Sequence, residues 1–184
     1  EHARKKELLT DILSSYINID IATLADFRRK DIIYALMQLL AGRVGNRLDY
    51  AKLARGVGVS PMTARTYVDF LEQTYLLSRI SVFSRSPDRA IVKAQKLYFS
   101  DNGMLNILSE VSSGAQFENA VFTQLRHHGD VRYYALKNGR EIDFILNKQF
   151  AFEAKEMPTK IDMRPLHTLA EQIAIPKYRL IGRH

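Results

Sequence analysis

The stretch that decides the fold is EIDFILNKQFAFEAK, residues 141–155. Apolar residues alternate with charged or small residues on both sides of its central Asn-Lys-Gln, and a period of two is typical of a half-buried strand. With those three residues as the loop of a hairpin, the faces of the two strands match in one register, because a shift by one residue would turn every side chain over. The sequence therefore predicts that Phe144 pairs with Phe152 and Asp143 with Glu153.

The two faces of this predicted hairpin differ in character. One face is apolar and consists of Ile142, Phe144, Leu146, Phe150, Phe152 and Ala154. The other face is charged and consists of Glu141, Asp143, Glu153 and Lys155. Carboxylates that face each other repel, so we expect a cation between them, and Mg²⁺ is suited to such oxygen ligands. The alternative is a solvated face with an ordinary cross-strand ion pair.

A further carboxylate, Glu118, is predicted on a helix that precedes the hairpin. Residues 118, 121, 122 and 125 form one stripe of that helix, and Glu118 is its only charged member. Burying such a carboxylate is costly unless it is paired or bound to a metal. A place in the first helical turn would also suit a negative charge, because it would complement the helix dipole.

An Asp followed by Glu-x-Lys on the next strand, here Asp143, Glu153 and Lys155, resembles the core motif of the PD-(D/E)XK nucleases. The resemblance implies that the carboxylates hold Mg²⁺ or Mn²⁺ against the scissile phosphate and that the lysine orients or activates the attacking water. Nucleases of this kind commonly carry a glutamate on the preceding helix, which corresponds here to Glu118. Glu141 is either an additional metal ligand or the ion-pair partner of Lys155.

Composition restricts the class of protein. The 184 residues are 46% hydrophobic, which is enough for one large or two small domains. The absence of cysteine excludes disulfides and suits a cytoplasmic location, and no apolar run predicts contact with a membrane. The net charge of +7 is concentrated in residues 1–100, which carry 16 Lys and Arg against 10 Asp and Glu. This imbalance favours DNA as a partner.

Residues 1–99 are predicted to form a helical segment and a winged helix-turn-helix. The predicted elements follow one another in the order of that motif. They are a short helix capped by Asp49, a Gly-containing turn, a helix opened by Ser60-Pro61, and two strands over 76–83 and 91–99. Its second helix and its loop at 84–93 would contact DNA. The predicted contacts, mostly to phosphates, are Arg65, Arg85, Arg89 and Lys93. The alternative is that the module only packs domains together.

Residues 100–184 are predicted to form a second, α/β domain. The helix with Glu118 is followed by a strand over 131–136, the hairpin, a helix over 163–174 and a strand over 177–181. This order is the layout of the restriction-endonuclease-like core.

The order of short motifs along residues 7–155 resembles the C-terminal region of archaeal-type AAA+ ATPases. The motifs are Leu53–Thr63, Leu71–Leu76, Lys96–Gly103, Phe117–Asn119, Glu141–Phe144 and Glu153–Lys155. The resemblance implies an upstream ATPase core as a partner. The chain itself lacks the G-x-x-x-x-G-K-[ST] loop that binds nucleotide phosphates, so we expect no ATP hydrolysis by it. The C-terminal domain of that family has no settled activity.

Two functions remain open from the sequence. The first is a Mg²⁺-dependent DNA endonuclease module, with Glu118, Asp143 and Glu153 as metal ligands and Lys155 serving the water. The second is a non-catalytic module that binds DNA or protein and regulates the ATPase. A freestanding transcription factor would leave the charged hairpin unexplained.

Overall fold

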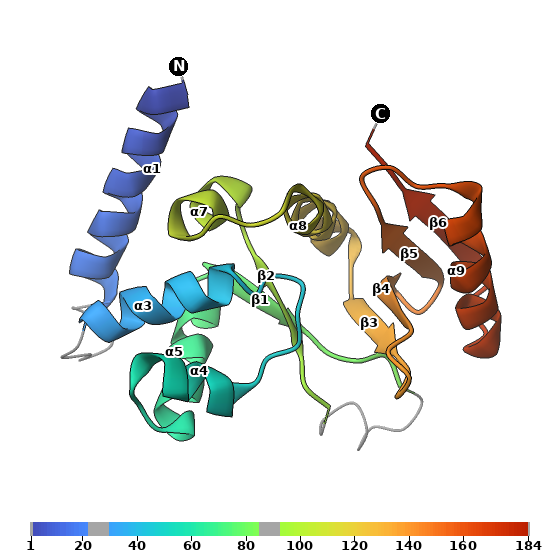
Figure 1. Cartoon of the computed structure of the whole chain (residues 1–184), viewed down its shortest axis with the longest axis horizontal. Helices are drawn as coiled ribbons and strands as arrows, with labels where there is room; N and C mark the ends of the chain where they lie inside the picture. The colour runs from blue at the N-terminus through green and yellow to red at the C-terminus, as the bar shows by residue number, and fades with distance from the viewer. Residues whose placement is uncertain (1, 22–29, 85–92, 184) are drawn as a thin grey trace.

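The computed structural model describes residues 2–21, 30–84 and 93–183, and it has a mixed α/β fold, as the sequence predicts (Figure 1). The first part of the chain holds α1 (His2–Ser15), η1 (Tyr16–Ile21), α3 (Lys30–Ala41), α4 (Tyr50–Val57), α5 (Pro61–Gln73), β1 (Leu77–Ile80) and β2 (Lys96–Phe99). The second part holds α7 (Asn102–Leu108), α8 (Ser113–Leu125), η2 (Arg126–His128), β3 (Val131–Ala135), β4 (Glu141–Leu146), β5 (Phe150–Ala154), α9 (Lys160–Gln172) and β6 (Lys177–Ile181). None of the helices within the described ranges combines the length and the apolar character needed to cross a membrane.

The short helices of the first part begin at the capping residues that the sequence predicts. The Asp49 carboxylate accepts a hydrogen bond of 3.0 Å from the Lys52 amide at the start of α4. The Ser60 hydroxyl accepts one of 3.0 Å from the Thr63 amide, and a proline at the first position of α5 leaves no amide there unsatisfied. Between the two helices, Gly58 adopts a φ of 69°, which favours glycine, and so ends α4.

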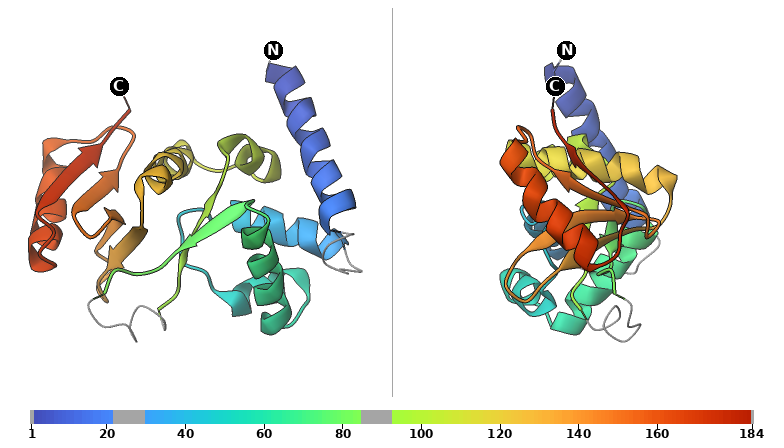
Figure 2. Two further views of the ribbon diagram at one scale, coloured as in Figure 1. Left: turned by 180° about the vertical axis from the view of Figure 1, so that it is seen from behind. Right: turned by 90° about the vertical axis from the view of Figure 1, so that its right-hand side faces the viewer.

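The two parts of the chain share one apolar core. Strands β1 and β2 form an antiparallel pair, and Val82, just beyond β1, bridges to Tyr133 of β3. The buried cluster around these residues draws side chains from α3, α5, β2, α8 and β4. Figure 2 shows the β1–β2 pair and α8 lying between the N-terminal helices and the second sheet.

The second sheet has the strand order β3-β4-β5-β6. The β3–β4 and β4–β5 pairs are antiparallel, whereas β6 returns parallel to β5 after the crossover helix α9. Leu166 and Leu169 of α9 pack against one face of this sheet, and Val121 and Phe122 of α8 belong to the core on the other face. Both faces are therefore covered, and the hairpin is more deeply buried than its alternating sequence predicts.

The predicted register of the β4–β5 hairpin is confirmed where the two strands pair. Phe144 lies opposite Phe152, and Leu146 lies opposite Phe150. Beyond Phe144 the ladder ends, and the carboxylate of Asp143 instead accepts a hydrogen bond of 3.0 Å from the Ala154 amide. Asp143 and Glu153 therefore remain neighbours at the open end of the hairpin.

The predicted division of the hairpin into an apolar and a charged face is wrong at β4, because this strand contains a bulge. Arg132 pairs with Ile145 and Tyr134 pairs with Ile142, so two residue steps on β3 face three on β4. An extra residue reverses the alternation of side chains. Ile142 consequently packs on the α9 side, away from Phe144. Glu141 and Asp143 lie on the same side as Phe144, where both meet Lys96 of β2.

Asn119 of α8 ties this helix to β2. Its side chain is fully buried, accepts a hydrogen bond of 2.8 Å from the Phe99 amide and donates one of 3.1 Å to the Phe99 carbonyl. It also donates to the Asn102 side chain over 2.7 Å. One amide side chain thus satisfies backbone groups that strand pairing would otherwise have to satisfy.

We expect Asn119→Ala to lower the free energy of unfolding by about 2 to 4 kcal/mol, because it leaves buried polar groups of Phe99 and Asn102 unpaired. Chemical denaturation followed by circular dichroism measures this change. Asn106→Ala is the matched control, because Asn106 is exposed and donates one long hydrogen bond of 3.3 Å to Gln116. An equal loss in both variants would contradict the anchoring role.

Candidate functional site

Three carboxylates surround the ammonium group of a buried lysine, Lys96. Its Nζ atom lies 2.8 Å from Glu141 Oε1, 3.7 Å from Asp143 Oδ1 and 3.8 Å from Glu118 Oε1. The side chain of Lys96 is only 3% exposed, so water screens these charges poorly. Glu153 lies beside Asp143. We call the carboxylates of Glu118, Glu141, Asp143 and Glu153 the acidic cluster.

Glu118 reaches the acidic cluster from the middle of α8. The helix begins at Ser113, so Glu118 is not in its first turn, and the helix-dipole alternative fails. Its Oε1 atom accepts a hydrogen bond of 2.6 Å from the Tyr98 hydroxyl of β2. Gly45 approaches the carboxylate from the other side with a φ of 75°, and a Cβ atom there would lie 3.0 Å from Oε1. Glycine is therefore favoured at this position by both its backbone angle and the space available.

Glu141 pairs with two cations of the first part of the chain. Arg47 donates to its Oε2 atom over 3.1 Å, and Lys96 donates to its Oε1 atom over 2.8 Å. Of the two alternatives for Glu141, the pairing with Lys155 does not form, because the bulge turns Glu141 toward β2. Lys155 instead donates a hydrogen bond of 2.6 Å to Asp162 of α9.

Asp143 and Glu153 are held by the backbone at the end of the hairpin. The Asp143 carboxylate accepts a hydrogen bond from the Ala154 amide. The backbone amide of Asp143 in turn favours the charged form of the Glu153 carboxylate by hydrogen bonding. Asp143 is 8% exposed, and Glu153 is partly buried. Asp143 and Glu153 are thus neighbours through their backbones, as the predicted register implies, and the positive charge of Lys96 opposes the rise of both pKa values.

Burial makes three carboxyl groups of the acidic cluster, those of Glu118, Asp143 and Glu153, weaker acids. Burial raises the pKa of Glu118 to about 7, and the charge of Asp143 adds to the increase while Lys96 opposes it. Burial likewise raises the pKa of Glu153 to about 8, again with the charge of Asp143 as the second cause. The pKa of Asp143 is also raised, chiefly by burial. Burial is the largest cause for all three, so the folded chain disfavours their charged forms, and a cation bound beside them would favour those forms.

The donor atoms of the acidic cluster suit a hard divalent cation, because all of them are carboxylate oxygens. Their arrangement is less suitable. In the described ranges, no three Asp, Glu or His side chains are gathered closely enough to hold a metal ion. The space between Glu118, Glu141 and Asp143 is instead taken by the ammonium group of Lys96.

The predicted DNA contacts are only partly described. Arg65 is exposed on α5, and its guanidinium lies 4.5 Å from the centre of the Tyr50 ring, which orients it without covering it. Lys93 is partly buried. Arg85 and Arg89 lie outside the described residues.

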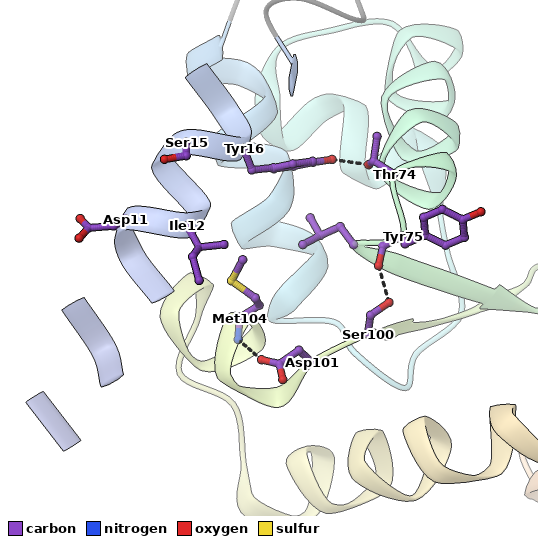
Figure 3. A pocket seen from close by; sticks show the side chains of 10 residues that line it. Asp11, Ile12, Ser15, Tyr16, Thr74, Tyr75, Ser100, Asp101 and Met104 are labelled. Carbon is purple, nitrogen blue, oxygen red and sulfur yellow. Dashed lines mark hydrogen bonds between the residues drawn. The ribbon is translucent and has the colours of Figure 1, made fainter. Parts of the chain in front are cut away.

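A pocket of about 530 Å³ lies away from the acidic cluster, between α1, α7 and the turn that follows α5 (Figure 3). Its walls include Ile12, Tyr16 and Met104, and the Tyr16 hydroxyl pairs with Thr74 across it. None of the predicted site residues lines this pocket.

Lys96 is the residue at the centre of the candidate site that sequence reasoning missed. It lies within the predicted strand over 91–99 and begins the observed β2, and a lysine in such a strand is ordinarily expected to face solvent. The available signal was the charge imbalance of the hairpin, which calls for a cation that the sequence alone does not identify.

Comparison with known proteins identifies relatives without an assigned activity. A family model described as "Domain of unknown function (DUF8612)" matches residues 1–115. An uncharacterized protein of Haemophilus influenzae is 27% identical over an alignment of 174 residues, and the match covers 86% of this chain. The match spans 43% of that protein's length. No solved structure matches the chain.

We expect the free energy of unfolding to fall as the pH rises from about 5.5 to about 8.5. Glu118 and Glu153 keep their protons to higher pH in the folded chain than in the unfolded chain, where their pKa is near 4.5. The folded state thus binds more protons in this window, and raising the pH favours unfolding. Thermal unfolding across the range measures the effect.

Glu153→Gln should flatten this pH dependence, because it removes the carboxylate with the larger increase in pKa. Glu110→Gln is the control, since Glu110 is exposed and lies outside the acidic cluster. The electrostatic account would be wrong if Glu153→Gln left the pH dependence of wild type unchanged.

Proposed function

Because the chain belongs to the DUF8612 family of domains of unknown function, we propose its function from the geometry of the acidic cluster. The proposal is that the chain is a DNA-binding module of a larger AAA+ ATPase and that it cleaves DNA at a PD-(D/E)XK-like site with Mg²⁺ or Mn²⁺. The observation that carries it is the gathering of the Glu118, Glu141 and Asp143 carboxylates within 4 Å of Lys96 Nζ, beside the end of the β4–β5 hairpin where Glu153 neighbours Asp143.

The order of elements supports both parts of this proposal. The succession α8-β3-β4-β5-α9-β6 agrees with the order of the restriction-endonuclease-like core, in which the catalytic hairpin follows a helix that carries a glutamate. The succession α3-α4-α5-β1-β2 agrees with a winged helix-turn-helix, in which α5 would face the DNA.

The residues of the acidic cluster have distinct roles in the proposed reaction. Glu118, Asp143 and Glu153 would hold the ion, with Glu141 as an additional ligand. A bound divalent cation would polarise the scissile phosphate and lower the pKa of a water molecule. The Ala154 amide orients the Asp143 carboxylate for this task. The hydrogen bond to Asp162 raises the pKa of Lys155, so Lys155 would act as a positive charge beside the phosphate and not as a base.

A second candidate function is a non-catalytic module that binds DNA or protein and regulates the ATPase. The position of Lys96 favours it, because an ammonium group among three carboxylates can serve as a purely structural ion-pair network. The two candidates differ in whether the acidic cluster binds a divalent cation and whether DNA is cut.

We expect wild type to cut DNA with Mg²⁺ or Mn²⁺ and Asp143→Asn to abolish cutting, because the substitution removes a metal-binding charge with little change of shape. The measurement is a cleavage assay on single-stranded, duplex and branched DNA. Asp130→Asn is the matched control, since Asp130 pairs with Arg132 on the surface. Its activity should equal that of wild type. No cutting of any substrate by wild type would leave the regulatory module as the function.

We also expect duplex DNA binding to weaken with salt, by a log–log slope of about −0.9 for each phosphate neutralised. Arg65→Ala should make this slope less steep by about 0.9, the amount expected for the loss of one phosphate contact. Arg164→Ala is the control, because Arg164 is an exposed arginine on α9, at the far end of the molecule from α1 (Figure 1). Fluorescence anisotropy at several salt concentrations tests both. A slope that Arg65→Ala does not alter would remove α5 from the DNA interface.

A further inference from the structure

Lys96 occupies a place in the acidic cluster that a divalent cation would also prefer. Three carboxylates from two different elements, α8 and β4, lie within 4 Å of its Nζ atom. A small positive charge between carboxylate oxygens is the arrangement in which a metal ion binds. The ammonium group therefore supplies from within the chain the charge that an ion would bring from outside.

The surroundings of Lys96 indicate that it is held there by charge. Lys96 as a whole residue is 2% exposed, and the shortest of its contacts with the three carboxylates is the hydrogen bond of 2.8 Å to Glu141. The Tyr133 ring lies 5.7 Å from Nζ and forms an aromatic wall on another side. An ammonium group buried this deeply would be strongly destabilising without its carboxylate partners.

Arg47 provides a contrast within the same network. It also pairs with Glu141, at 3.1 Å, but its side chain is 42% exposed and lies at the rim of the acidic cluster. Arg47 therefore contributes positive charge near the carboxylates without filling the space between them. Removing the charge of Arg47 changes only the general electrostatic attraction of the acidic cluster for a cation. Removing the charge of Lys96 also vacates the position between the carboxylates, so the two effects can be distinguished.

We propose that Lys96 is an internal competitor of the divalent cation: its ammonium group fills the position between Glu118, Glu141 and Asp143, and an ion enters only when this side chain withdraws. This inference rests on the proposed function, because it assumes that the acidic cluster is the metal site. Lys96 is then a positioning residue that keeps the site closed in the absence of its ion. The flexible four-carbon stem of lysine allows such a withdrawal.

The test is Mn²⁺ binding to the full chain, measured by isothermal titration calorimetry and by the rise of the unfolding temperature with added Mn²⁺. Lys96→Met removes the charge and keeps an unbranched side chain. We expect it to bind Mn²⁺ at least about ten-fold more tightly than wild type, because a full charge at the ion's own position is removed. Arg47→Met, the matched control, should change the affinity less than about three-fold, because a rim charge is screened by water.

A second variant covers the case in which Lys96→Met does not fold without metal. Lys96→Gln also removes the positive charge, and its amide group can still donate hydrogen bonds to the carboxylates. Circular dichroism checks its folding. This variant should also bind Mn²⁺ more tightly than wild type, because the position between Glu118, Glu141 and Asp143 no longer holds a charge.

The outcomes separate this inference from the proposed function. If wild type binds Mn²⁺ and both Lys96 variants bind it no more tightly, the competitor role is overturned while the metal site stands. Equal gains from Lys96→Met and Arg47→Met would also overturn it, since general electrostatics would then account for the binding. If the Lys96 variants gain affinity but no form of the protein cuts DNA, the competitor role holds and the nuclease fails. If no variant binds Mn²⁺, both ideas are overturned.

Discussion

The burial of one positive charge constrains how the two parts of this chain meet. Lys96 begins β2, and its carboxylate partners come from α8 and from β4. A buried ammonium group without such partners would cost several kcal/mol, so β2, α8 and the bulged strand must stay together for the folded state to be stable. The apolar core joins the same elements, since the Tyr98 ring of β2 stacks on Phe122 of α8 and meets Phe144 of β4 at a tilt.

The bulge in β4 is the local irregularity that makes this possible. In a regular strand Asp143 and Phe144 would point to opposite faces, and the carboxylate would be directed toward the apolar side chains of α9. The extra residue directs Asp143 toward Lys96 while Phe144 keeps its place in the core. Bulges are frequent beside functional sites because they re-aim a side chain in this way. The bulge is thus an independent structural reason to regard this end of the hairpin as a site.

Under the proposed function, the acidic cluster would have one role with Lys96 in place and another with this side chain withdrawn. With Lys96 in place, the cluster is a stabilising network that joins two parts of the chain. With the lysine withdrawn, the same carboxylates would present a strong cation site beside an exposed lysine, Lys155. The raised pKa values of Glu118 and Glu153 have the same origin, because burial and crowding disfavour their charged forms. A nuclease and a regulatory module would therefore use the same carboxylates. They differ in whether a divalent cation or the ammonium group of Lys96 lies between those carboxylates.

The sequence by itself determined the features that depend on near neighbours. The caps at Asp49 and Ser60, the β4–β5 register and the order of elements follow from local hydrogen bonding and from the period of apolar residues. It also brought Asp143 and Glu153 together, because a hairpin turn fixes which residues of its two strands lie side by side.

The tertiary structure alone decided which charges meet. The bulge depends on pairing with β3, which the hairpin sequence does not contain. The role of Lys96 depends on Glu141, 45 residues away along the chain, and no local pattern encodes a contact over that separation. Lys155, adjacent to the motif carboxylates in sequence, turns instead to Asp162 on α9. Local patterns set the direction of each side chain from its own strand or helix, whereas the cation that a buried carboxylate meets depends on how distant elements pack.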